Sequence, residues 1–340
     1  MSSVVLRSIA STENQDVSPL GADPMVHVDA DMRHVLDVWA EMDPKPIEHC
    51  TVAEARAQPT LAMALNRILH DRPDEAGVSM ELRMIPGGAG NTKARVYAPA
   101  GAATALPMIL YLHGGGFVLG DLGSFDATPR ALARKLGAIV VSAHYRQAPE
   151  ASLAEAAEDT EAAWRWMGDA AASLGGDAAR TAIVGEDAGA SLAVELVLAL
   201  RQQGSPAGPR HLGLVSPLAS TIVDLPSRRA NERSRPLSAA GLRWLQRNAA
   251  RRGAGLDDPR LNLAERELGG LPPTTLILAG LDPLRSDGDL LADAMRRSGV
   301  WVDATTYEGV THGFFGLARI VNKAMFAQSQ LLRNLTESLM

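Results

Sequence analysis

The 340 residues of the chain are 46% hydrophobic and 21% charged and carry a formal net charge of −6. This composition is typical of a globular protein with a sizeable core, and the acidic balance argues against a nucleic-acid-binding surface. The single cysteine, Cys50, excludes an internal disulfide. It suits a reducing compartment, so we expect a cytoplasmic protein. No apolar run approaches the ~20 residues that span a bilayer, and the first residues do not resemble a signal peptide.

The N-terminal part of the chain is expected to lie outside the main fold. We expect residues 1–25 to form a disordered tail and residues 26–75 to form helices. Apolar residues at helical spacing predict a first helix, with Val28, Met32, Val35, Leu36, Trp39 and Met42 on one face. A second helix is predicted to begin near Thr51 and to carry Leu61, Leu65, Ile68 and Leu69.

Short apolar runs alternate with helical segments over residues 76–340. Several of these runs are continuously apolar, as expected for parallel strands covered on both faces by helices. The alternation predicts an α/β fold with a doubly wound, mostly parallel sheet. The eight runs read "ELRMI", "KARVYAP", "PMILYLHGG", "AIVVSAHY", "TAIVG", "HLGLVSPL", "TTLILAGLDPL" and "VDATTY".

One arginine-rich segment, residues 222–256, interrupts this alternation. It is expected to contain one helix capped by Ser238 and to form a lid over the site together with the N-terminal helices. We expect its arginines to form a solvated face, with a selector for anionic substrates as the alternative.

Four motifs fall at the carboxyl ends of predicted strands, where open α/β sheets place their active sites. In "LYLHGGGF", His113 is followed by three glycines, whose backbone N–H groups can approach a ligand oxygen without an intervening Cβ. Donors arranged in this way stabilise a developing negative charge, which is the role of an oxyanion hole. A flexible glycine loop is the less specific interpretation.

The second motif, "TAIVGEDAGASLA", reads as a strand, a sharp turn permitted by Gly185 and Gly189, and the start of a helix. Such a turn places a nucleophile at its centre, and here the central residue is Asp187. The last two motifs place Asp282 and His312 directly after later strands. The order of position 187, an acid and a histidine is that of the α/β-hydrolase triad.

With these motifs the chain resembles the hormone-sensitive-lipase-like esterases, bacterial family IV of the α/β-hydrolases. The resemblance runs from about residue 28 to the C-terminus and includes "ARAQPT", "YRQAPE" and "GLPPTTLILAGLDPL". It implies an eight-stranded sheet, a helical cap built from the N-terminal helices and the 222–256 insert, and a carboxylic ester substrate. It also implies a general base, His312, an orienting acid, Asp282, and an oxyanion hole formed by Gly114, Gly115 and Ala188.

The chain departs from that family at several positions. Asp187 stands where the family has its nucleophilic serine, and Glu186 stands where aspartate is common. Phe125 stands where histidine is usual, and His144 replaces the aspartate of an Asp-Tyr-Arg run. These changes indicate a site that has drifted or been retuned, and a single engineered serine-to-aspartate exchange is the alternative.

An aspartate at position 187 leaves three functional hypotheses open. The first is an esterase scaffold whose activity is weak, altered or abolished, because a carboxylate has no proton to give and is a weak nucleophile toward esters. The second is a hydrolase in which Asp187 attacks an epoxide, a haloalkane or a lactone. The third is a non-catalytic binder of a small molecule. The first two would use Asp282 and His312, and Asp187 and Asp282 are expected to raise the pKa of His312.

No other class of ligand is indicated by the sequence. The eight histidines lack metal-ligand spacing and no phosphate-binding loop is present, so we expect no metal and no cofactor. The predicted partner is a small ester-like molecule rather than nucleic acid or a membrane, and a homodimer is left open.

Overall fold

The computed structural model describes residues 23–70, 77–101, 104–205, 208–253 and 255–340. Its eight strands form one sheet in the order β1-β2-β4-β3-β5-β6-β7-β8. β2 pairs antiparallel with β1 and β4, and every other pair is parallel. The strands are β1 Val78–Gly87, β2 Gly90–Pro99, β3 Leu106–Leu112, β4 Ile139–Ala143, β5 Gly176–Glu186, β6 Leu212–Val215, β7 Thr274–Leu281 and β8 Val302–Thr311.

The expected α/β-hydrolase sheet is therefore confirmed, and each of the eight predicted runs lies in or beside a strand. The α-helices are α1 Ala30–Ala40, α2 Val52–Arg56, α3 Leu61–Ile68, α4 Ala127–Leu136, α5 Leu153–Asp169, α6 Ala171–Leu174, α7 Ala188–Gln202, α8 Pro226–Ala230, α9 Ala239–Ala249, α10 Arg285–Arg297 and α11 Asn322–Leu339.

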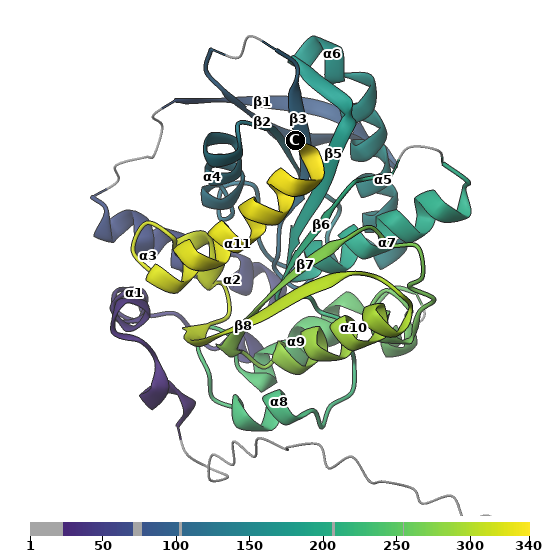
Figure 1. The fold of residues 1–340 in the computed structure, drawn as a ribbon. Coiled ribbons are helices and arrows are strands. Elements are labelled where there is room, and N and C mark those ends of the chain that lie inside the picture. Colours follow the sequence, from purple (N-terminus) through teal and green to yellow (C-terminus); the bar gives the residue numbers. More distant parts are fainter. Residues whose placement is uncertain (1–22, 71–76, 102–103, 206–207, 254) are drawn as a thin grey trace, which may run out of the picture.

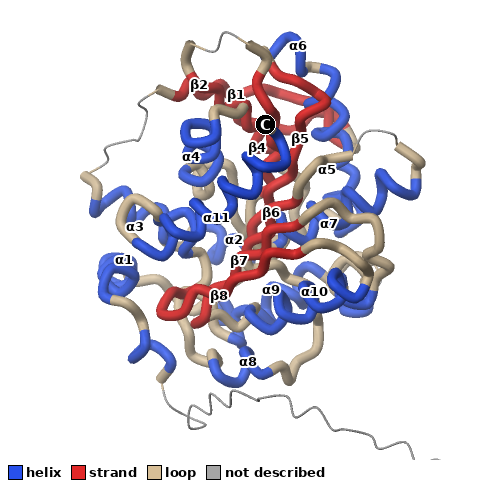
Figure 2. Tube along the Cα trace, viewed as in Figure 1, coloured by secondary structure: helices blue, strands red, loops and turns tan. Residues whose placement is uncertain are grey.

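Helices cover both faces of the twisted sheet (Figures 1 and 2). One hydrophobic cluster packs α5, α7, α9 and α10 against one face, and the other packs α1, α3, α4 and α11 against the opposite face. This double cover explains why the central strands are continuously apolar: β3 and β7 are buried along almost their whole length.

The N-terminal segments differ in detail from the sequence prediction. Of the expected tail, residues 1–22 lie outside the described residues, whereas Pro24–His27 form a 3₁₀ turn capped by Asp23. The single helix expected from Thr51 is two helices, because Pro59 lies between them. Thr51 caps α2 through a capping box, and Thr60 caps α3.

In its described residues, the 222–256 insert contains two α-helices rather than the one expected. Ser238 caps α9 as predicted, since its side chain accepts a hydrogen bond from the Gly241 N–H. α8 was missed because it is a single turn. The described part of the chain contains no helix long and apolar enough to cross a membrane.

The expectation of a fully solvated arginine face is wrong for Arg228. Its guanidinium lies 2.9 Å from the Asp287 carboxylate, and the two side chains are only 3% and 0% exposed. Arg229, one residue later, pairs with Asp224 at the surface. A buried ion pair thus links the insert to α10, and the arginine-rich sequence pattern did not predict it.

Replacing Arg228 by alanine is expected to lower the free energy of unfolding by about 3–5 kcal/mol, because Asp287 would remain buried without its cation. Arg229→Ala is the matched control and should change it by less than about 1 kcal/mol, as for other exposed pairs. Chemical denaturation of both variants measures the difference. Equal effects of the two substitutions would contradict the role of the buried pair.

Candidate active site

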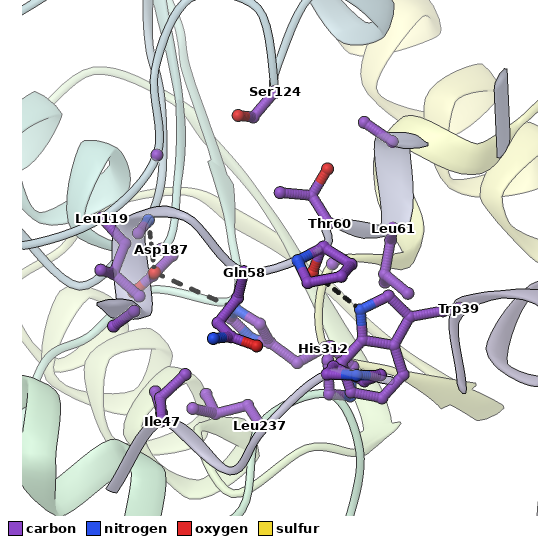
Figure 3. A pocket seen from close by; sticks show the side chains of 18 of the residues that line it. Trp39, Ile47, Gln58, Thr60, Leu61, Leu119, Ser124, Asp187, Leu237 and His312 are labelled. Carbon is purple, nitrogen blue, oxygen red and sulfur yellow. Dashed lines mark hydrogen bonds and ion pairs between the residues drawn. The ribbon is translucent and has the colours of Figure 1, made fainter. Parts of the chain in front are cut away.

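A cavity of about 840 Å³ lies over the carboxyl ends of the central strands. Asp187 and His312 lie on one side of it, and side chains of the N-terminal helices, among them Trp39 and Leu61, lie on the other (Figure 3). Residues 233–238 of the insert also line it. Both segments that the sequence set apart from the sheet therefore contribute to the walls of this cavity.

Asp187 occupies a sharp turn between β5 and α7, as the glycine pattern predicted. Its backbone has φ 51° and ψ −116°, a conformation that non-glycine residues rarely adopt. The flanking glycines are required by close contacts. A Cβ on Gly185 would lie 2.3 Å from the Gly189 carbonyl oxygen, and one on Gly189 would lie 2.0 Å from that of Leu112.

The carboxylate of Asp187 is held by the glycine loop that follows β3. Its Oδ2 accepts hydrogen bonds from the N–H groups of Gly115, at 2.9 Å, and Gly116, at 2.8 Å. This loop thus presents two backbone donors to the side chain at position 187. The acceptor of both hydrogen bonds is the protein's own Asp187 side chain.

The pair of glycine donors differs from the expected pair. Gly114 makes no hydrogen bond to Asp187 in the described residues, and its carbonyl oxygen lies 2.8 Å from Nδ1 of His113. The second glycine donor is instead Gly116, which was not among the expected donors. The third expected donor, Ala188, is buried at the start of α7, directly after Asp187. Motif spacing identified the loop, but the orientation of each peptide group depends on its neighbours in three dimensions.

Asp282 and His312 come together although 30 residues separate them. Nδ1 of His312 lies 2.8 Å from Oδ2 of Asp282, whose Oδ1 accepts a hydrogen bond from the Leu284 N–H. On the other side of the ring, Nε2 lies 3.9 Å from Oδ2 of Asp187. The three side chains therefore form one array, with the imidazole between two carboxylates.

This array favours imidazolium. Burial alone would lower the pKa of His312, but Asp282, and then Asp187 and Glu186, outweigh it and raise the pKa to about 9. Burial also raises the pKa of Asp187, against the lowering effect of His312 and of the two glycine N–H groups. At neutral pH the histidine is therefore protonated and cannot act as a base.

Glu186 contributes to this field, although its place in the sequence predicted no role for it. It is buried, and its Oε1 accepts hydrogen bonds from Tyr111 at 2.7 Å and from Thr128 at 2.6 Å. Burial raises the pKa of Glu186, whereas these hydrogen bonds lower it. Its position beside Asp187 was the only available signal, because Tyr111 and Thr128 are distant in the sequence.

Replacing Asp187 by asparagine is expected to lower the pKa of His312 below about 9, since one of the charges that raise it is removed. The raised pKa also implies a stability profile. Imidazolium contributes stability that is fully present below pH 6.5, the ordinary pKa, and is lost as the pH rises through about 9. NMR titration of the imidazole and denaturation across this window measure both effects. An unchanged pKa in Asp187→Asn would contradict the coupling.

No three histidine, cysteine or acidic side chains among the described residues are placed to hold a metal ion. Asp187, His312 and Gly115 line the cavity, and Asp282 lies behind His312. These are the parts of an acyl-transfer site with a carboxylate in place of the attacking hydroxyl.

The profile of a family described as "alpha/beta hydrolase fold" matches residues 109–316. The ethyl acetate hydrolase of Pseudomonas putida is 32% identical over 282 residues, which cover 82% of this chain and 88% of that protein. Esterase LipI of Mycobacterium tuberculosis is 34% identical, with 78% and 85% covered. The solved esterase of Pyrobaculum calidifontis is 30% identical with a TM-score of 0.80, covering 91% of this chain and 98% of that one. This chain therefore belongs to the alpha/beta hydrolase family, in its hormone-sensitive-lipase-like (family IV) group of esterases.

Proposed function

We propose that this protein binds small carboxylic esters in the 840 Å³ cavity and that Asp187 holds its esterase turnover at a low level. The observation that carries the proposal is the pair of hydrogen bonds from Gly115 and Gly116 to the Asp187 carboxylate. An ester carbonyl needs those donors as charge develops on its oxygen. In this chain it must first displace a carboxylate from them.

Two further features suppress acyl transfer. Asp187 has no hydroxyl proton to pass to His312, and its attack on an ester would form a mixed anhydride. His312 is itself protonated near neutrality, because its pKa is raised to about 9. The names of the relatives, an ethyl acetate hydrolase and an esterase, support a small ester as the ligand.

Substitutions at position 187 test the binding part of this proposal. Asp187→Ala removes the acceptor from the N–H groups of Gly115 and Gly116. We therefore expect this variant to bind a ketone analogue such as 4-phenyl-2-butanone more tightly than the unchanged chain does. Asp187→Asn is the matched control, since its amide oxygen can still accept from Gly115 and Gly116. Calorimetric titration compares the three proteins. No binding by any of them would overturn the proposal.

A second candidate function is supported by the other oxygen of the same carboxylate. Oδ1 of Asp187 is buried and has no hydrogen-bond partner among the described residues, whereas Oδ2 is held by two N–H groups. Oδ1 could attack a saturated carbon, forming a C–O bond as the bond to a halide or epoxide oxygen breaks. In the ester that results, Oδ2 is the carbonyl oxygen, and the glycine donors would stabilise its charge when water attacks.

Among the described residues, no tyrosine hydroxyl is free to assist the leaving atom in this alternative. The four tyrosine hydroxyls are engaged elsewhere, donating to Asp126, Glu186, the His113 carbonyl and Gln330. Incubation with styrene oxide or 1-bromobutane, followed by mass spectrometry of the peptide carrying Asp187, tests it. A stable alkyl adduct in a His312→Ala variant supports the second function, and an unmodified peptide excludes it for these reagents.

A further inference from the structure

Two histidines outside the reacting group lie beside the glycine loop: His113, which is buried, and His144, which is half-buried. His113 follows β3 and His144 follows β4, and the parallel register pairs Leu112 with Ala143, which brings the two histidines side by side. Their rings stack at 16°, and Nε2 of His113 lies 3.0 Å from Nδ1 of His144. The register of two neighbouring strands thus creates a histidine pair that the sequence does not display.

The hydrogen bonds of His113 determine where its proton lies. Its Nδ1 is 2.8 Å from the carbonyl oxygen of Gly114, which can only accept, so Nδ1 carries the proton. In the neutral ring Nε2 is then an acceptor. The donor to Nε2 must be the Nδ1–H of His144.

The backbone of the pair is held in place. The hydroxyl of Tyr145 donates to the His113 carbonyl at 2.9 Å, and its ring stacks on the imidazole with centroids 4.5 Å apart. The His144 N–H donates to the Lys93 carbonyl, and the His144 carbonyl accepts from Thr92. These contacts hold the backbone of both histidines.

The Gly114 carbonyl links this pair to the reaction site. The peptide between Gly114 and Gly115 is planar and trans, so its C=O and N–H point in opposite directions. The C=O is directed at His113 and the N–H at Oδ2 of Asp187. A Cβ on Gly120 would lie only 2.5 Å from the Gly114 oxygen, so this side of the peptide is closely packed.

We propose that His144 is a positioning residue for the oxyanion donor: its Nδ1–H holds His113 in one tautomer, and His113 fixes the peptide whose N–H is that of Gly115. The catalytic part of this inference rests on the proposed function, because it assumes that the Gly115 N–H serves an ester oxyanion. The tautomer does not depend on that assumption.

The residue at position 144 determines whether the imidazole of His113 is neutral or positively charged. The family that this chain resembles has aspartate there, and an aspartate would accept from Nε2 of His113 instead of donating to it. With Nδ1 already donating to Gly114, His113 would then carry two protons and a positive charge. With His144 at this position, both hydrogen bonds of the His113 ring are kept while His113 stays neutral.

The surroundings of the pair support neutrality. Burial, and then the neighbouring His144, lower the pKa of His113 to about 4. Burial also lowers the pKa of His144. The charges of Asp121 and Asp159 raise this pKa, whereas those of Lys93 and Arg56 lower it. Both rings are therefore neutral across the neutral pH range.

Nitrogen NMR of the histidines in the unchanged chain tests the tautomer directly. We expect His113 to be neutral and protonated at Nδ1 at pH 6, and to remain so in His144→Asn, whose amide can donate to Nε2. In His144→Asp we expect doubly protonated His113 at the same pH. Finding Nε2-protonated neutral His113 in the unchanged chain, or no difference between the Asn and Asp variants, overturns the proposal.

The catalytic part is tested in the Asp187→Ser background with p-nitrophenyl acetate. His144→Ala should lower kcat on the order of 10²-fold, the cost of losing one oxyanion donor, and should change KM less. His144→Asn should restore most of kcat, which a packing defect alone would not allow. Unchanged kcat in His144→Ala refutes the positioning role. If Asp187→Ser hydrolyses no ester, the proposed function fails, and the tautomer measurement still decides the chemistry of the pair.

Discussion

The Asp187→Ser variant is expected to hydrolyse p-nitrophenyl acetate at least ~10³-fold faster than the unchanged chain, since removing the serine of a comparable triad costs about 10⁶ in kcat. Three effects act together. The hydroxyl supplies a nucleophile with a proton to transfer, and removal of the carboxylate frees the N–H groups of Gly115 and Gly116. It also takes away one of the charges that raise the pKa of His312.

Asp187→Ala is the matched control for this gain. It frees the same donors and lowers the same pKa, but it provides no nucleophile. We therefore expect it to remain close to the rate supported by binding and the oxyanion loop alone. A serine variant no faster than the alanine variant would show that the rest of the site has lost the ability to transfer an acyl group.

The second large effect is expected from Asp282→Asn in the Asp187→Ser background, which should lower kcat about 10⁴-fold. Asp282 accepts a hydrogen bond from Nδ1–H of His312 and so leaves Nε2 facing position 187 as the base. An asparagine whose oxygen still accepts from the Leu284 N–H turns its amide toward His312. It would then stabilise the wrong tautomer.

Steady-state kinetics across pH measures this effect, and Asp293→Asn is the matched control. Asp293 lies on α10, is largely exposed and pairs with Arg296 within the same helix. Its substitution should leave kcat within twofold, as expected for an exposed pair far from the chemistry. If Asp282→Asn behaves like Asp293→Asn, the hydrogen bond to His312 has no part in the reaction.

Much of the fold was predictable from local patterns. The continuously apolar runs, such as the one that forms β7, can only be buried on both faces, which requires helices on either side of a parallel sheet. The boundaries of the helices were harder to predict from the sequence than the sheet was. The turn around Pro59 divides two helices with compatible apolar spacing, and α8 is too short to show a period.

The candidate site was predictable where chemistry follows from chain order and backbone type. Gly185 and Gly189 indicated a turn that only glycine permits, and the positions of Asp282 and His312 after strands placed them at one edge of the sheet. The roles of Glu186 and Gly116 were not predicted. Their roles depend on Thr128, Tyr111 and the rotation of one peptide group, none of which leaves a signal in neighbouring residues.

The sequence by itself determined that this chain forms an α/β-hydrolase scaffold with an aspartate where a serine is expected, because periodicity, glycine positions and chain order are local properties. Only the tertiary structure decided that this aspartate occupies the oxyanion donors and that His144 lies against His113. These contacts join residues that are 31 to 72 positions apart. Hydrogen bonds act over about 3 Å, so the register of neighbouring strands, rather than sequence spacing, selects which groups can form them.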